Sequence, residues 1–464
     1  MKKNFILFIV SFAMLLEAVD TTILNTAIPV MAHSLRVNPL DLKLALISYL
    51  VSLAIFIPIS GWIADKFGVK KVFIWALVIF TLSSVWCGFS HNLYELICAR
   101  FVQGLGGSLT MPVGRLIIIR TCERHELLAK MSVVVMVAAL GMMLGPLLGG
   151  VITTHFSWRW IFWVNVPVGF LAVSLSLFLL PNMPPVAVHP LDKLGFILFG
   201  SGLAILIYGL SIFSESDVHR IRAVVSILVA ITLLLAYCFH SYHKKYPIVK
   251  VELLRSRTFR ISVMGNLLTR LGFGGMPFLL PLLLQMALGF SPQLSGLLLA
   301  PTAFGVVLVK PLSVYILRFF GFKKLLILNT ILVSLSLCLF TAIDKTTSIY
   351  SIGILTFIYG FLISLQYTGM NSLAYASITH EELSAATSIM STVQQLAQSF
   401  GVATAAILVK FFSVSGLAVL TIKTFHQTFF TMGLLTFLSI LIFIHLKNED
   451  GRELIEIPKK SMSH

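Results

Sequence analysis

Fourteen apolar stretches run along this chain, and each is close to the roughly 20 residues that a helix needs to cross a bilayer. Charged residues make up only 11% of the 464 residues, against roughly 25% in soluble domains, and the mean hydropathy is +0.96. We therefore predict an all-α polytopic membrane protein embedded in a lipid bilayer. The predicted spans are residues 5–31, 43–64, 72–90, 93–119, 131–154, 160–181, 194–213, 221–240, 259–287, 293–317, 324–343, 348–371, 384–411 and 425–446.

The basic residues are distributed unevenly between the predicted loops. If the N-terminus is cytoplasmic, 23 of the 34 lysines and arginines fall in cytoplasmic segments, 7 in outside segments and 4 within spans. Because cytoplasmic loops carry an excess of these residues, we expect both termini in the cytoplasm and a plasma-membrane location, in a bacterium the inner membrane. Basic loops also explain the net charge of +16, so we expect no nucleic-acid partner.

The sequence lacks the usual signals of enzyme chemistry. It has no GxxxxGK[ST] nucleotide loop, none of its five cysteines has metal-site spacing, and no nucleophile–base pair stands out. We therefore expect no enzyme activity, no cofactor and no metal site.

A short repeat indicates an internal duplication. DKFGVKK (residues 65–71) follows the second span, and RFFGFKK (residues 318–324) follows the tenth. A basic turn at the same place in two halves is typical of duplicated transporters. We predict an N-terminal six-helix bundle (1–185), an inserted helix pair with its linkers (186–250), a C-terminal six-helix bundle (251–448) and a short tail (449–464).

The loop GWIADKFGVKK, residues 61–71, combines turn glycines with one acid and three bases. The acid can pair with a basic partner at the end of a helix, and the bases anchor the cytoplasmic side. The residues that stand out in this loop are Gly61, Asp65, Lys66, Gly68, Lys70 and Lys71.

The fourth span carries an arginine in its interior. Arg100, Gln103, Gly104 and Gly107 share one helical face. Because a charge in mid-membrane is expensive, Arg100 should face a wet cavity or a carboxylate. A purely structural ion pair is the alternative.

The fifth span carries GMMLGPLLGG. Gly141, Gly145 and Gly149 form a ridge that suits tight helix packing, and Pro146 and Gly150 complete the motif. Tight packing and a role in rocking between two states are compatible readings.

Two acids, Glu17 and Asp20, interrupt the first span and share one face of its helix. An internal carboxylate can take a proton from one side of the membrane and release it to the other. Asp20 is the leading proton carrier. Glu17 is either its partner or a counter-ion for the substrate.

Polar residues in the second half are candidates for the substrate cavity. Arg270 lies near the middle of the ninth span, and Lys310 lies within the tenth, where it either reaches the interface or faces the cavity. The thirteenth span is polar enough either to line a cavity or to bond between helices. With the first and fourth spans included, the cavity candidates are Asn25, Gln103, Arg270, Lys310, Gln394 and Gln398.

These motifs resemble those of the major facilitator superfamily. The 61–71 loop resembles its GxLaDrxGrkxxl signature, and ARFVQGLGG resembles its RxxqGxgaa motif. GMMLGPLLGG resembles gxxxGPxxGG, which marks antiporters, and DTTILNTAIP (residues 20–29) resembles the first span of fourteen-span drug:proton antiporters. The resemblance is dense over about the first 170 residues.

The resemblance implies two six-helix bundles with an inserted helix pair. It implies that Arg100 takes part in proton transfer and that the 61–71 loop latches the halves in the outward-facing state. Asp20 falls on a position of the family signature, and Glu17 is an addition to it. Lys66 and Val69 stand where the family has arginine, which implies a weaker latch.

We therefore predict a proton-coupled transporter, expected to be monomeric, that exports small drug-like or lipophilic cationic compounds by alternating access. The alternative is export of organic anions or metal–organic acid chelates, bound by Arg100, Arg270 and Lys310.

Overall fold

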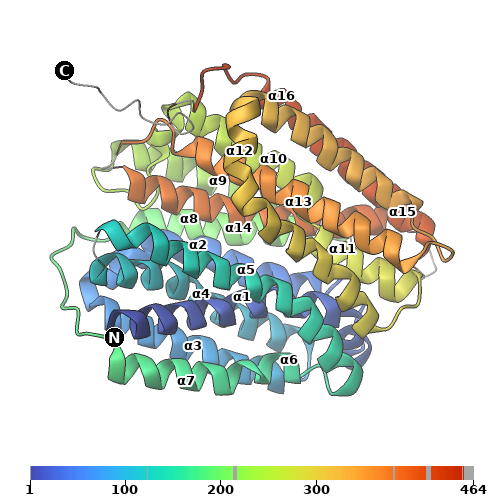
Figure 1. The fold of residues 1–464 in the computed structure, drawn as a ribbon, viewed down its shortest axis with the longest axis horizontal. Helices are drawn as coiled ribbons and strands as arrows, with labels where there is room; N and C mark the ends of the chain where they lie inside the picture. Colours follow the sequence, from blue (N-terminus) through green and yellow to red (C-terminus); the bar gives the residue numbers. More distant parts are fainter. Residues whose placement is uncertain are drawn as a thin grey trace.

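The chain folds into long helices that run roughly side by side across the molecule (Figure 1). The computed structural model describes residues 2–122, 124–212, 217–379, 382–413, 420–451 and 453, and every regular element within these ranges is helical. The elements are α1 (Lys2–Leu35), α2 (Lys43–Phe67), α3 (Val69–Phe89), α4 (Leu93–Thr121), α5 (Arg124–His155), α6 (Trp160–Trp163), α7 (Asn165–Leu179), α8 (Lys193–Ile212), α9 (Asp217–His243), η1 (Val251–Arg255), α10 (Arg257–Phe273), α11 (Met276–Leu282), η2 (Leu283–Ala287), α12 (Pro292–Leu339), η3 (Phe340–Ala342), α13 (Ile349–Ala374), α14 (Leu383–Phe412), α15 (Ile422–Leu438) and α16 (Ile440–Phe443).

Within the described residues, 13 helices are long and apolar enough to cross a bilayer. One of them, Pro292–Ala342, has 51 residues, far more than one crossing needs. Gly321 interrupts it with a non-helical backbone (φ 70°, ψ 168°), so this stretch holds two spans. The count then agrees with the fourteen predicted spans.

The two repeated loops share a backbone feature. Gly68 has φ 92° and Gly321 has φ 70°, a region that only glycine adopts readily. Each glycine ends one span and allows the next to start at once. The F-G-x-K-K repeat therefore marks the same kind of turn in both halves.

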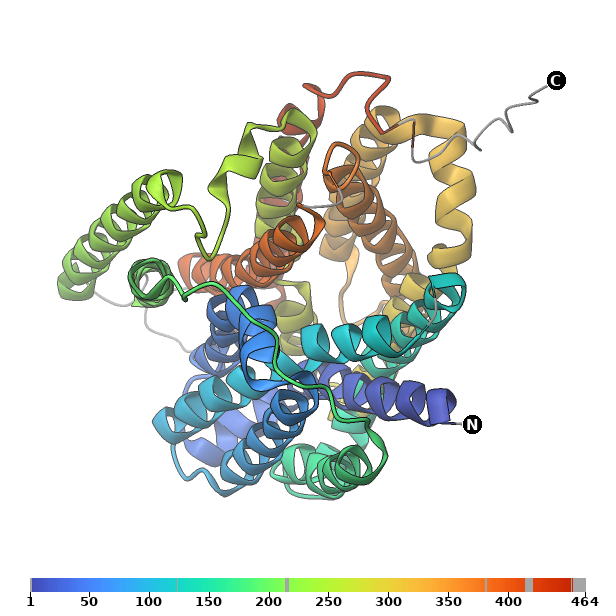
Figure 2. The same ribbon diagram turned by 90° about the vertical axis from the view of Figure 1, so that its left-hand side faces the viewer.

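The helices gather into two bundles with a separate pair beside them. Figures 1 and 2 show α1–α7 on one side of the molecule and α10–α16 on the other. The α8–α9 hairpin lies at the edge, where α8 contacts both α2 and α14 (Figure 2). This is the predicted arrangement of two bundles with an inserted pair. The division at residues 185, 250 and 448 stays a prediction.

The two faces of the molecule can be told apart by the ends of the chain. Helix α1 begins on the same face on which α15 and α16 end, at the left of Figure 1, and we call this the terminal face. On the opposite face the bundles touch. There the Thr154 Oγ1 accepts a hydrogen bond from the Gln293 backbone N–H (3.1 Å), and Gln285 Nε2 donates to the Thr26 carbonyl (2.9 Å).

The ninth predicted span is not one continuous helix. It consists of α10, α11 and the π-helical η2, with Gly274 and Gly275 between the first two. Pro277 lies in the first turn of α11, where its missing N–H leaves no helical bond unmade. The break lets Gly401 of α14 pack against the Arg270 carbonyl and Gly274.

Candidate functional site

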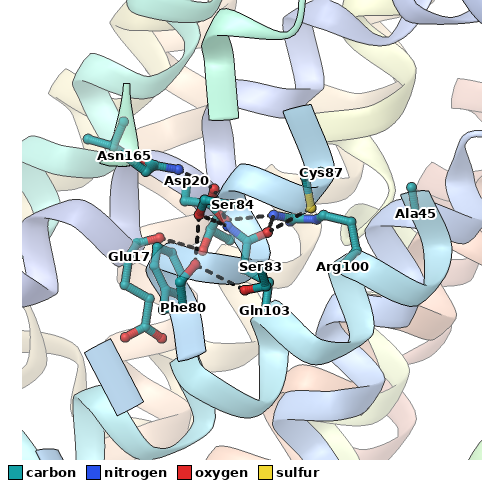
Figure 3. A network of polar contacts seen from close by, with 12 residues as sticks. Glu17, Asp20, Ala45, Phe80, Ser83, Ser84, Cys87, Arg100, Gln103 and Asn165 are labelled. Atoms are coloured by element: carbon teal, nitrogen blue, oxygen red, sulfur yellow. Dashed lines mark hydrogen bonds and ion pairs between the residues drawn. The ribbon is translucent and has the colours of Figure 1, made fainter. Parts of the chain in front are cut away.

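A buried polar cluster lies inside the first bundle (Figure 3). The Asp20 carboxylate on α1 accepts hydrogen bonds from Arg100 Nη1 on α4 (2.6 Å), Gln103 Nε2 on α4 (3.0 Å) and Asn165 Nδ2 on α7 (2.7 Å). Arg100 and Gln103 reach the same carboxylate because they lie three residues apart on one helical face. The predicted meeting of Arg100 with a carboxylate is therefore found, and its partner is Asp20.

The cluster is closed to water and internally hydrogen-bonded. Asp20, Arg100, Gln103 and Asn165 are each at most 1% exposed. The Gln103 side-chain carbonyl accepts from Arg100 (2.6 Å), and its amide also donates to the Ser84 hydroxyl of α3 (2.7 Å). A buried charge is tolerated only with such partners. Any loss or gain of a proton at Asp20 must therefore rearrange contacts between three helices.

Glu17 lies outside this cluster. Figure 3 shows its carboxylate pointing away from Asp20. The side chain is only 5% exposed, and its Oε2 atom has no hydrogen-bond partner. Arg115 on α4 is close enough to attract it electrostatically. The two acids share a helix, but they do not share a set of partners.

A cavity lies between the two bundles. Its walls include Thr22 and Asn25 of α1, Met142 and Pro146 of α5, and Gln398 of α14. Apart from Thr302, the remaining wall is apolar or aromatic, formed by Ala139, Phe273, Met276, Pro277, Leu280, Leu299, Ala303, Val306, Tyr359, Ile363 and Tyr367. Its volume of about 150 Å³ is comparable to an engineered protein cavity that binds benzene. A larger molecule would need the bundles to separate further.

Arg270 lies directly behind this wall. It is 8% exposed, and its guanidinium carbon lies 3.9 Å from the centre of the Tyr367 ring. Its hydrogen bonds go to the neutral side chains of Asn266 (3.4 Å) and Gln398 (3.3 Å). Among the described residues its charge therefore has no carboxylate hydrogen-bonded to it.

The other cavity candidates lie further away. Lys310 is exposed and donates to the Thr368 hydroxyl at 3.5 Å. It is one turn beyond Val306, which lines the cavity. Gln394 bonds to Asn371 (3.0 Å). The structure thus brings Arg270 and Gln398 together at the cavity, and it leaves Lys310, Gln394 and Gln103 outside the wall.

The 61–71 loop makes its contacts with the first bundle and with the linker that follows this bundle. Asp65 pairs with Arg120 at the end of α4 (2.5 Å), and its backbone carbonyl accepts from Val186 N–H (2.7 Å). Lys70 donates to the carbonyls of Leu177 and Leu180 at the end of α7 (2.9 and 2.7 Å). Of the remaining loop residues, Gly61 and Lys71 are exposed. Lys66 lies over the Trp62 ring, and Gly68 makes the turn.

The α5 glycines pack on both bundles. Gly141, Gly145 and Gly149 lie against α1, where Ala18, Thr22 and Ile23 occupy the space that a side chain would need. Gly150 faces the other bundle, and a Cβ there would lie 2.5 Å from the Pro292 carbonyl of α12. The motif therefore sits at the seam between the bundles on the opposite face.

Several site residues were not predicted from the sequence. Asn165 and Ser84 bind the Asp20 cluster, and Tyr49 of α2 lies under the Arg100 guanidinium, 4.3 Å from ring centre to guanidinium carbon. A polar residue inside an apolar span is the available signal, and Asn165 carries it. In the described part of the chain, no group of three or more His, Cys, Asp or Glu side chains is placed to hold a metal.

Comparison with known proteins gives the family. The family model described as Major Facilitator Superfamily matches residues 10–242 and 262–461. The protein named "Putative multidrug resistance protein MdtD" from Enterobacter sp. (strain 638) is 33% identical over 452 residues, covering 97% of this chain and 96% of the relative. Its namesake from Escherichia coli (strain K12) is 33% identical over 460 residues, covering 98% and 97%.

Solved structures agree at the level of the fold. A D-xylose–proton symporter superposes with a TM-score of 0.69 at 15% identity, covering 97% of this chain and 99% of the symporter. The POT family transporter PepTSo superposes with a TM-score of 0.68 at 15% identity, covering 94% and 97%. The matches to the family model and to the MdtD proteins settle the assignment: this chain is a multi-pass membrane transporter, not an enzyme, and it belongs to the major facilitator superfamily.

Proposed function

We propose that this protein exports small molecules in exchange for protons. The observation that carries the proposal is the pairing of Asp20 with Arg100 inside the first bundle, sealed from water and next to a cavity between the bundles. When substrate leaves and a proton binds Asp20, the carboxyl becomes neutral and its attraction for Arg100 falls. Helices α1, α4 and α7, which share the cluster, then relax relative to one another.

The terminal face is the cytoplasmic one in this proposal, as the excess of basic residues in its loops favours. The bundles touch on the opposite face through α5, α12 and η2, so this conformation faces inward. Asp65 pairs with Arg120 of its own bundle rather than with the other bundle. That arrangement fits a latch that has opened, in a protein that acts as a monomer.

The cavity wall favours lipophilic compounds. The residues that line it include aromatic and methionine side chains and no Asp, Glu, Lys or Arg. A flat, apolar body packs well against such a wall, while Asn25, Thr22 and Gln398 offer hydrogen bonds that fix its orientation. In this reading Glu17 or Asp20 neutralises a cationic substrate.

Arg270 favours a second candidate, export of organic anions or metal–organic acid chelates. It is the buried charge nearest to the wall in the second bundle, and it is bonded only to neutral groups. Arg100 is already paired with Asp20, so Arg270 and Lys310 are the cations left for such a substrate.

Everted membrane vesicles with an imposed pH gradient distinguish these readings. We expect a lipophilic cation to release protons from wild-type vesicles, and Asp20→Asn to abolish the release at equal expression. If only citrate-like anions collapse the gradient, and Arg270→Ala stops them, the second candidate is correct. If neither class of compound moves protons, the proposal of proton coupling is wrong.

A further inference from the structure

Several polar atoms in and near the Asp20 cluster are buried without a hydrogen-bond partner, among them the Tyr49 hydroxyl and Glu17 Oε2, and the Thr21 side chain is the neutral group near that hydroxyl. Tyr49 is 1% exposed and Glu17 is 5% exposed, so bulk water does not supply the missing hydrogen bonds of either side chain. A buried polar group without a partner destabilises the fold, so each such group calls for an explanation.

Both groups meet at Gly107 of α4. A Cβ on this glycine would lie 2.9 Å from the Tyr49 hydroxyl and 3.4 Å from Glu17 Oε1. The absence of a side chain leaves a small gap with an oxygen on either side. One water molecule, or a change of side-chain rotamer, would join them.

The other end of Tyr49 contacts the proton site. Its ring lies under the Arg100 guanidinium at 4.3 Å, within range of a cation–π interaction. The guanidinium is not fully paired, because its Nε atom is buried without a partner. Tyr49 therefore touches Arg100, the partner of Asp20, with its ring and approaches Glu17 with its hydroxyl.

The surrounding charges come from a few helices. Helix α1 supplies Glu17 and Asp20, α4 supplies Arg100 and Arg115, and α3 supplies the Cys87 thiol beside Arg100. Helices α5 and α7 also pack on α1, and they present Gly141 and the neutral Asn165 amide there. Tyr49 contacts Arg100 on one side of this set and lies near Glu17 on the other.

We propose that Tyr49 is a positioning residue that couples the protonation of Glu17 to that of Asp20. When Asp20 takes up a proton, Arg100 loses its ionic partner and stays on the Tyr49 ring. The Tyr49 O–H then donates to the Glu17 carboxylate, directly or through one water, and keeps that acid ionised while Asp20 is neutral. The pair would hold one proton at a time. This inference rests on the proposed proton coupling, but it concerns the proton equilibrium itself.

The test is an infrared pH titration of the purified full-length protein without substrate. The titration follows the absorption band of the protonated Glu17 carboxyl, which is identified by its loss in Glu17→Gln. We expect Tyr49→Phe, which keeps the ring, to move the midpoint of that band to higher pH by about one unit, as loss of a hydrogen bond to a charged group implies. Gly107→Ala, whose methyl group fills the gap, should produce the same shift. Tyr237→Phe is the matched control, because that buried hydroxyl donates to the Val249 carbonyl in the α8–α9 region (2.9 Å), and it should produce none.

An unchanged midpoint in both Tyr49→Phe and Gly107→Ala would overturn the inference, and so would an equal shift in Tyr237→Phe. Either variant suffices if the other does not fold. The effect must also depend on Asp20: in Asp20→Asn, where residue 20 is always neutral, Tyr49→Phe should shift the Glu17 midpoint by more than in the wild type, and an equal shift would show that the acids are not coupled. Absence of proton–substrate exchange in vesicles would refute the proposed function alone, because the titration needs no transport.

Discussion

Asn165 contributes to the proton site only as a donor. Its Nδ2 atom donates to Asp20 Oδ1 at 2.7 Å, while its own Oδ1 atom is buried without a partner. The donated bond stabilises Asp20 more when it is ionised than when it is neutral, because hydrogen bonds to a charged acceptor are stronger. In the proposed exchange, Asn165 would tune how readily Asp20 accepts a proton, without carrying one.

We predict that Asn165→Leu moves the pH midpoint of proton–substrate exchange to higher pH. The substitution removes one donor from the ionised form of Asp20 and leaves the neutral form nearly unchanged, a difference of about 1–3 kcal/mol. Exchange measured in vesicles between pH 5 and 9 checks this. In the Asp20→Asn background the same substitution should change the thermal stability by much less, and an equal loss of stability there would contradict the argument.

At this scale the sequence predicted three members of the site, Asp20, Arg100 and Gln103, and missed Asn165 and Ser84. Asp20, Arg100 and Gln103 stand out because ionic and amide groups are rare within spans. Asn165 and Ser84 are also polar, but their role depends on which helices meet, and Asn165 is 145 residues from Asp20. Motif spacing within one helix cannot specify a contact between helices that far apart. The separation of Glu17 from the cluster was missed for a similar reason, since a shared helical face does not fix where two carboxylates point.

Helix α5 packs closely against both bundles because it has glycines on two of its sides. Its glycine ridge lies on α1, and Gly150 lies against α12 on the opposite face. Small residues let helix backbones approach closely, so the same motif both packs α1 and closes one end of the molecule. The sequence predicted the first of these contacts as a packing ridge, but not the second.

We predict that Gly150→Ala shifts the protein toward the outward-open state. A Cβ there would lie 2.5 Å from the backbone carbonyl of Pro292, which cannot move like the end of a flexible side chain. Labelling of introduced cysteines on the opposite face, in membranes, should become faster. Gly353→Ala is a suitable control, because a Cβ at Gly353 meets nothing within 4 Å. Unchanged labelling in Gly150→Ala would contradict the assigned role of this seam.

The α8–α9 hairpin is fastened by one side chain at its base. Asp192 Oδ1 accepts from the Gly195 N–H (3.0 Å), which caps α8, and it also bonds to His240 Nε2 of α9 (2.8 Å). The preceding linker is tied to the first bundle, because Trp62 Nε1 donates to the His189 carbonyl at 2.7 Å. The hairpin thus has its own anchor, apart from the proton site and the cavity.

We predict that Asp192→Ala lowers the free energy of unfolding by about 1–2 kcal/mol, the usual effect of losing a helix cap, with transport largely preserved. Thermal unfolding in detergent, read beside vesicle transport, checks both parts. Asp192→Asn is the matched control: it keeps a capping oxygen and should retain most of the stability. Loss of transport in a well-folded Asp192→Ala protein would mean that the hairpin takes part in the transport cycle.

The whole molecule is asymmetric between its two faces and between its two bundles. On the opposite face α5 and α1 of the first bundle bond to α12 and η2 of the second. On the terminal face the 61–71 loop bonds to its own bundle and to the linker that follows it. The sequence predicted the duplicated architecture from a five-residue repeat, and both repeats contain a glycine with positive φ. It had no means of predicting the conformational state, because alternating access gives one sequence two packings of similar energy.

We predict that a crosslink on the opposite face stops transport but leaves the terminal side accessible. Thr154→Cys combined with Gln293→Cys places thiols on α5 and α12 at the point where the Thr154 hydroxyl now accepts from the Gln293 N–H at 3.1 Å. After oxidation the bundles cannot part there, so vesicle transport should fall to background and return on reduction. Binding of substrate from the terminal side should persist, since the cavity lies on that side of the seam.

Each single cysteine variant, in the presence of the five native cysteines, should keep its activity under the same oxidant. Full transport by the crosslinked protein would show that the opposite face need not open, and alternating access through this seam would then be wrong.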